Sequence, residues 1–141
     1  MDLAVTEGEL RALLSEVAFT RQYGFRLHAI ADGECTLEVP FQDLFERPGA
    51  RVSGQVFMAA ADVAMWLAVM TRLGAGDRSV TSDMSTAFLG AARREAFRCR
   101  AVILKLGARL IYGVAECRRL DGGLLTHHGI TYVRAPATAV A

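Results

Sequence analysis

The chain has 141 residues, of which 52% are hydrophobic and 22% are charged, and its formal net charge is +1. This length suits one domain with its own core, and the balance excludes both a disordered chain and the basic surface typical of nucleic-acid-binding proteins. The mean hydropathy of +0.27 is high for a lone soluble domain, so a membrane segment or a large subunit interface is needed to explain it.

The first predicted element is an amphipathic helix over residues 7–18. Thr6 and Glu9 have the spacing of a capping box, and the apolar residues that follow them recur with the helical period. No basic segment followed by an apolar run precedes this helix. We therefore expect no signal peptide and a cytoplasmic protein.

Two extended runs follow, at residues 25–30 and 35–39. Asp32 and Gly33 lie between them and predict a hairpin turn. Residues 41–51, which contain a Pro-Gly pair, are predicted to form a loop.

Residues 53–73 are predicted to form one long helix that ends at Gly74. The helix is apolar almost all round, which is typical of a helix buried on every side. It is about long enough to cross a bilayer, but Asp62 lies at its middle, where a carboxylate costs roughly 2.5–3.5 kcal/mol on insertion scales. We therefore expect a core helix and no membrane function.

The rest of the chain is predicted to form long strands separated by glycine-containing turns. They cover residues 79–89, 94–106, 109–120 and 124–134. Arg98 and Arg100 alternate with apolar residues, so one face of their strand is expected to be exposed to solvent and the other to pack against the core. The tail, about residues 136–141, is expected to be frayed.

One buried helix and long antiparallel strands together predict an α+β architecture. A helix that is apolar all round needs cover on every side, so a curved sheet must wrap it. We expect residues 1–141 to form a single domain of this kind.

The cysteines are odd in number and widely spaced, which favours buried thiols over a disulfide framework or a metal site. They are Cys35, Cys99 and Cys117. We expect no metal centre.

Several motifs resemble those of hotdog-fold acyl-CoA thioesterases of the phenylacetate-degradation type. Residues 53–55, Ser-Gly-Gln, and Asp62 fall on the HGG-x6-D helix start of that family. Residues 80–89 are similar to its next strand, and residues 106–107 and 120–133 match later motifs in kind and order. The resemblance covers residues 20 to 134 and implies the hotdog fold, a curved antiparallel sheet wrapped around one long central helix.

The resemblance implies that Asp62 is the central catalytic residue, acting as general base or nucleophile. A carboxylate among apolar neighbours must meet a partner, a pocket or water, because burying it unpaired is costly. A structural Asp62 paired with an arginine is the alternative. Thr81 matches the family Ser or Thr that orients the acid or the attacking water, and a plain strand residue is its alternative.

The start of the long helix is the second predicted part of the site. Backbone N–H groups in a first helical turn are unpaired and carry the positive end of the helix dipole, so the Gly54 amide suits an oxyanion donor. Gly54 also permits tight packing, and Ser53 also suits an ordinary N-cap. Ser53 and Gln55 replace the family His and second Gly, and Arg47 lies where relatives often have Asn or Gln; we expect all three to contact substrate.

Gly54 and Asp62 are eight residues apart, or about 12 Å along one helix, so one carbonyl group cannot contact both. The resemblance implies a dimer in which the amide of one chain faces the acid of the other. A homodimer or a homotetramer built as a dimer of dimers is therefore expected, and its interface explains the high hydropathy.

The expected reaction is hydrolysis of an acyl-CoA thioester, with coenzyme A as part of the substrate and no other cofactor. Four basic residues at strand ends are candidates for its phosphates, with a solvated rim as the alternative. They are Arg93, Arg94, Lys105 and Arg109. A non-catalytic acyl-CoA or aromatic-ligand binding protein remains an alternative. A hydratase of the same fold is disfavoured, because such enzymes rely on a His near the central helix and no His lies between residues 29 and 126.

Overall fold

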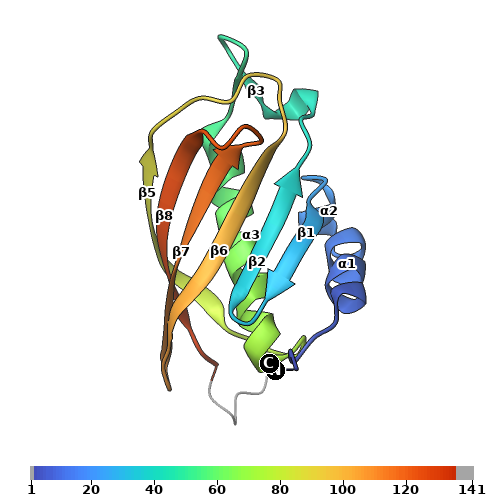
Figure 1. Cartoon of the computed structure of the whole chain (residues 1–141), viewed down its shortest axis with the longest axis vertical. Coiled ribbons are helices and arrows are strands. Elements are labelled where there is room, and N and C mark those ends of the chain that lie inside the picture. The colour runs from blue at the N-terminus through green and yellow to red at the C-terminus, as the bar shows by residue number, and fades with distance from the viewer. Residues whose placement is uncertain (1, 136–141) are drawn as a thin grey trace.

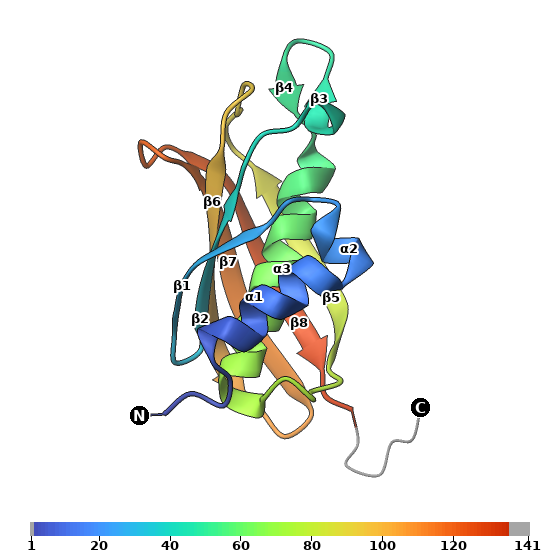
Figure 2. The same ribbon diagram turned by 90° about the vertical axis from the view of Figure 1, so that its right-hand side faces the viewer.

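The computed structural model describes residues 2–135, which form two consecutive N-terminal helices, one long central helix and a sheet that curves around it (Figures 1 and 2). The helices are α1 (Glu7–Glu16), α2 (Ala18–Arg21) and α3 (Gly54–Leu73). The strands are β1 (Arg26–Ala31), β2 (Glu34–Val39), β3 (Glu46–Arg47), β4 (Arg51–Val52), β5 (Val80–Phe88), β6 (Phe97–Leu106), β7 (Leu110–Arg119) and β8 (Leu124–Val133). The predicted tail lies outside the described residues.

Six strands form one sheet in the order β1-β2-β6-β7-β8-β5, and every neighbouring pair is antiparallel. This sheet curves around α3, which packs mainly on β6, β2 and β7 (Figure 1). Helices α1 and α2 lie on the other side of α3 (Figure 2). The predicted α+β architecture, with a curved sheet around one helix, is confirmed.

Helix α3 is long and apolar enough to cross a membrane, but 67% of its most apolar window is buried inside the protein, as expected for a core helix. The Ser53 hydroxyl caps it by accepting a hydrogen bond from the Gln55 amide at 3.3 Å, and Gly74 ends it with a φ of 88°. The prediction of burial on every side is wrong for one face. The half-buried or exposed residues of this face, here called the α3 stripe, are Gln55, Met58, Ala59, Asp62 and Trp66.

The N-terminal capping box is confirmed in both directions. The Thr6 hydroxyl accepts from the Glu9 amide at 3.1 Å, and the Thr6 amide donates to the Glu9 carboxylate at 3.0 Å. Helix α1 ends at Glu16, two residues before the predicted end, because Val17 turns to an extended conformation with a ψ of 121° before α2 begins. The hairpin of β1 and β2 is confirmed, with Gly33 at a φ of 70° in its turn.

The prediction of a plain loop over residues 41–51 is wrong. This segment contains a single 3-10 turn at Asp43–Phe45 and the small hairpin of β3 and β4, in which Glu46 pairs with Val52. Gly49 and Ala50 make its turn with positive φ values of 93° and 58°. The hairpin lies beside the start of α3 and so helps to shape the surroundings of Gly54 (Figure 1).

The last four predicted strands are confirmed, with shifts of a few residues at their ends. Strand β6 begins three residues later than predicted, after Arg94, which has a φ of 46° that a strand does not allow. Arg98 and Arg100 lie on its solvent-exposed face and form ion pairs with Glu38 and Glu34 of β2, at 3.0 and 2.8 Å respectively. The three cysteines are free and buried, as predicted.

Candidate active site

The Asp62 carboxylate lies on the α3 stripe and is held by two hydroxyl groups. Its Oδ1 atom accepts a hydrogen bond from Thr81 Oγ1 of β5 at 2.5 Å and from the Tyr132 hydroxyl of β8 at 2.9 Å. The Tyr132 hydroxyl also lies 2.8 Å from the Asp62 backbone carbonyl. The prediction that this carboxylate meets a partner is therefore confirmed, and within residues 2–135 that partner is not an arginine.

The second carboxylate oxygen, Oδ2, forms no hydrogen bond within residues 2–135. The carboxylate lines a cleft of about 300 Å³. The other lining residues are mostly apolar: Phe19, Val63, Trp66, Ser79, Val80, Thr81 and Tyr132. An acid with one oxygen fixed and one free, at the wall of an apolar cleft, suits a general base or a nucleophile.

Tyr132 is a site residue that the sequence did not single out. It is only 3% exposed, and burial and the nearby Asp62 carboxylate raise the pKa of its hydroxyl well above the ordinary range. The hydroxyl therefore stays protonated at neutral pH and acts as a donor. Tyr132 is the direct cross-strand partner of Thr81 in the pairing of β5 with β8. Only this register places the two hydroxyls together.

Gly54 is the first residue of α3, and its N–H donates no hydrogen bond within the described part of the chain. A Cβ atom at this position would lie 2.8 Å from a ring atom of Phe88. The amide is thus free to bind a ligand oxygen, while the missing side chain also allows the close approach of Phe88. The geometry therefore fits both roles predicted for Gly54, as an oxyanion donor and as a small residue that permits tight packing. Ser53 is confirmed as the N-cap of α3.

A second cleft, of about 310 Å³, lies at the start of α3. It brings together Arg47, Ser53 and Gln55, which the sequence predicted as substrate contacts, and Tyr23 and Phe45 form part of its wall. The three predicted residues therefore share one surface beside the Gly54 amide, although about 12 Å of helix separates Gly54 from Asp62.

The four basic residues predicted for phosphate contacts do not form one cluster. Arg93 and Arg94 lie before β6, near the start of α3, where Arg93 donates to the Gly49 carbonyl at 3.1 Å and Arg94 pairs with Glu46 at 2.6 Å. Lys105 and Arg109 lie at the other end of β6, in and beside the turn to β7. Eight strand residues, 97–104, lie between the two pairs and separate them by roughly 25 Å.

A protein-family comparison matches residues 50–126 to the family described as thioesterase superfamily. A protein of Saccharolobus solfataricus named "putative esterase" is 29% identical over 92 residues, which is 65% of each chain. The chain therefore spans just under two thirds of the length of this curated relative.

Solved structures of similar fold include proteins named as thioesterases. A "putative thioesterase" from Silicibacter sp. TM1040 is 30% identical, with 96% of each chain covered and a TM-score of 0.86. A phenylacetic acid degradation-related protein from Ralstonia eutropha JMP134 is 24% identical, with 88% of this chain and 97% of that chain covered and a TM-score of 0.78. A hypothetical thioesterase from Streptococcus pneumoniae TIGR4, solved with coenzyme A, is 13% identical, with 79% and 85% covered and a TM-score of 0.72.

Proposed function

Because the chain belongs to the thioesterase superfamily, we propose that it hydrolyses acyl-CoA thioesters to a free acid and coenzyme A. Its six-stranded antiparallel sheet around α3 is the hotdog fold that the sequence predicted. The observation that carries the proposal is the Asp62 carboxylate, which Thr81 and Tyr132 hold through one oxygen while the other stays free.

In the proposed reaction, the free Oδ2 atom of Asp62 takes a proton from water as the water oxygen attacks the thioester carbonyl carbon. The carbon–sulfur bond then breaks, and the proton passes to the leaving thiolate, so that one water and one thioester give one acid and one thiol. A direct attack by Oδ2, which forms an acyl-enzyme anhydride that water then hydrolyses, uses the same free oxygen. Thr81 and Tyr132 orient the carboxylate in either route.

The Gly54 amide is the proposed oxyanion donor, and it belongs to the other subunit of a dimer. One chain holds its Gly54 amide and its Asp62 carboxylate about 12 Å apart, which is too far for one thioester carbonyl. If the α3 stripes of two antiparallel copies face each other, the amide of one copy approaches the acid of its partner. The uncovered stripe, with Asp62 and Trp66 in it, supports this arrangement.

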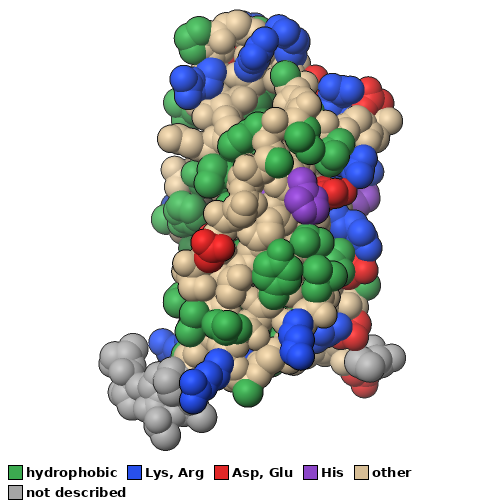
Figure 3. All heavy atoms as spheres, turned by 90° about the vertical axis from the view of Figure 1, so that its left-hand side faces the viewer, with side chains coloured by type: hydrophobic (Ala, Val, Ile, Leu, Met, Phe, Trp, Pro, Cys, Tyr) green, Lys and Arg blue, Asp and Glu red, His purple; other side chains and the backbone are tan. Residues whose placement is uncertain are grey.

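The β5 edge of the sheet also supports self-association. Seven of the nine β5 residues are exposed, and the side chains of Val80 and Phe88 are 63% and 56% exposed. Figure 3 looks onto this edge, where hydrophobic side chains are spread over a surface with few charges in its middle. An unpaired edge strand is prone to pair with another chain, so we propose a homodimer, or a dimer of dimers, closed through β5 and α3.

Coenzyme A as the carrier is supported by the streptococcal relative that was solved with this ligand. Arg93 and Arg94 lie at the same end of α3 as the Gly54 amide, where they suit the coenzyme A phosphates. We propose no cofactor other than the coenzyme A of the substrate, and a cytoplasmic location.

A panel of short, medium, long and aryl acyl-CoAs, with detection of the released thiol, tests the proposal. We expect steady turnover of at least one member. Ser53 and Gln55 replace the family His and Gly, which favours a second candidate function, a non-catalytic acyl-CoA or aromatic-ligand binding protein. Saturable binding without thiol release across the panel would establish that second function and overturn the first.

Mixed dimers test whether two chains share one site. One chain carries Asp62→Asn, and the other carries Gly54→Pro together with Phe88→Leu. Proline removes the amide proton and suits a first helical turn, and the smaller side chain at position 88 makes room for its Cβ. Each mutant homodimer should be inactive. A mixed dimer purified with two different tags holds one site with both defects and one site with neither, so about half of the wild-type activity per dimer should return. Mixed dimers that stay inactive would exclude a shared site.

A further inference from the structure

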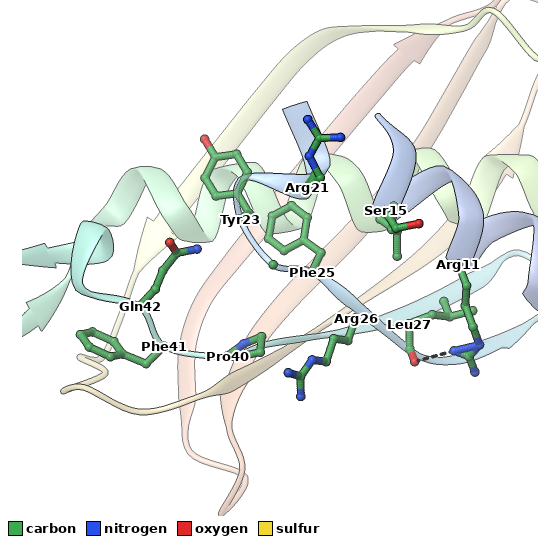
Figure 4. A pocket seen from close by; sticks show the side chains of 12 residues that line it. Arg11, Ser15, Arg21, Tyr23, Phe25, Arg26, Leu27, Pro40, Phe41 and Gln42 are labelled. Carbon is green, nitrogen blue, oxygen red and sulfur yellow. Dashed lines mark hydrogen bonds between the residues drawn. The ribbon is translucent and has the colours of Figure 1, made fainter. Parts of the chain in front are cut away.

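A cleft of about 610 Å³, twice the volume of the Asp62 cleft, lies between α1, the connection from α2 to β1, and the end of β2. It is here called the arginine cleft (Figure 4). Its charged lining residues are Arg11, Arg21 and Arg26, and no acidic residue lines it. None of its lining residues belongs to the Asp62 cleft.

Two of these three arginines are available to a ligand. Arg11 donates to the Leu27 carbonyl at 3.3 Å and pairs with Glu7 at 3.1 Å. Arg21 and Arg26 are exposed and form no ion pair within residues 2–135. Glu38 of β2 lies directly across from Arg26, but its carboxylate is paired with Arg98 at 3.0 Å. Guanidinium groups that no carboxylate pairs favour an anionic ligand, because they offer donors and positive charge only.

The floor of the arginine cleft is apolar. Leu14, Phe25 and Leu27 are buried beneath it, and Pro40 and Phe41 are half-buried at its side. Such a floor favours a ligand with an apolar body.

A nucleotide or a sugar fits this lining poorly. The Tyr23 ring stacks on Phe25 at 5.0 Å and 5°, and Phe19 and Phe45 contact it from other directions, so its faces are not open to a base. The remaining polar side chains are already used, because Ser15 donates to the Ala12 carbonyl and Gln42 to the Gln22 carbonyl. The N–H and O–H groups of a nucleotide or sugar would find few acceptors here.

We propose that the arginine cleft binds a carboxylate with an apolar body, such as a medium-chain fatty acid, at a site separate from the Asp62 cleft. In Figure 4 the Arg21 and Arg26 side chains lie on opposite sides of the Phe25 ring, so a head group meets one guanidinium at a time. This suits a singly charged carboxylate. The acid released by thioester hydrolysis belongs to this chemical class, but binding at this cleft does not depend on the proposed reaction.

Titration calorimetry of the full chain with decanoate, decanol and acetate tests the proposal. We expect decanoate to bind, and decanol and acetate to bind at least about tenfold more weakly, because each lacks the head group or the apolar body. The double variant Arg21→Gln/Arg26→Gln should lose about tenfold or more in decanoate affinity. Arg100→Gln on the outer face of the sheet is the matched control and should bind like the wild type. Asp62→Asn should also leave decanoate binding unchanged.

Amide chemical shifts locate the bound decanoate without relying on a variant. We expect shifts concentrated at residues 21–27 and 41–42 and little change at residues 79–82 of the Asp62 cleft. The amide spectrum of the double variant without ligand should match that of the wild type, which shows that its fold is kept. No decanoate binding, equal affinity for decanol, unchanged affinity of the double variant, or shifts centred on the Asp62 cleft would each overturn the proposal.

Discussion

Replacing Tyr132 by Phe removes one of the two hydrogen bonds that hold the Asp62 carboxylate and leaves the ring in place. The Tyr132 side chain is 3% exposed, and its hydroxyl lies 2.9 Å from Asp62 Oδ1. A hydrogen bond to a charged group contributes roughly 1.5–3 kcal/mol. Since 1.4 kcal/mol corresponds to about tenfold in rate, kcat/KM should fall by about 10-fold to 100-fold if the transition state uses this orientation.

The assay is thiol release from the best acyl-CoA, with thermal unfolding measured on the same protein samples. Tyr112→Phe is the matched control, because Tyr112 is 44% exposed on the outer face of β7, and it should change neither quantity. Thr81 still holds Asp62 in the Tyr132→Phe variant, so the fold should persist. A kcat/KM within twofold of the wild type, together with a lower Tm, would show that the Tyr132 hydroxyl only stabilises the fold and would refute the reasoning.

Three further predictions concern pH, the helix start and the phosphates. The folded-state pKa of Tyr132 is raised above its ordinary value of 10.0, so the stability that its protonated hydroxyl contributes is complete below pH 10 and is lost as the pH rises beyond it. The difference in unfolding free energy between the wild type and Tyr132→Phe, measured by urea unfolding, should therefore shrink from pH 9 to pH 11. A difference that stays constant over this range would contradict the prediction. In Gly54→Ala the new methyl group lies 2.8 Å from the Phe88 ring, and displacing that ring from its rotamer costs about 0.5–1.5 kcal/mol. Activity should therefore fall, and Phe88→Leu in the same chain should restore it. If Phe88→Leu does not restore activity, the loss comes from the start of α3 and not from the contact with Phe88. Arg93→Ala should raise KM for acyl-CoA about tenfold with little change in kcat. Lys105→Ala, at the far end of β6, should change neither constant. A raised KM in Lys105→Ala and an unchanged KM in Arg93→Ala would place the coenzyme A phosphates at the other end of the sheet.

The elements that the sequence predicted well are those with long periodic patterns. Helix α3 and strands β5 to β8 each run for nine residues or more, so their apolar periods are plain. The β3 and β4 strands have two residues each, too few to show alternation, and their hairpin was predicted as a loop. The α3 stripe also escaped prediction, because Met58, Ala59 and Trp66 are apolar and only the arrangement of the sheet shows which face stays uncovered.

The candidate site was predictable where its residues lie in local motifs. Asp62, Gly54 and Thr81 belong to such motifs, and the structure brings the Asp62 and Thr81 side chains together. Tyr132 is 70 residues from Asp62, and only the register of β5 with β8 places its hydroxyl there. The division of the basic residues follows from strand length, because Arg93 and Arg94 precede β6, whereas Lys105 is near its last residue and Arg109 follows it.

The turnover of Asp62→Asn tests the central claim most directly. The Oδ1 atom of asparagine still accepts hydrogen bonds from Thr81 and Tyr132, so the substitution keeps the packing of α3 and removes only the negative charge and the basic oxygen. Steady-state thiol release from the best acyl-CoA, with Tm measured in parallel, is the experiment. We predict a fall in kcat of about 10²–10⁴ with a Tm close to that of the wild type. A kcat equal to that of the wild type would contradict a catalytic Asp62.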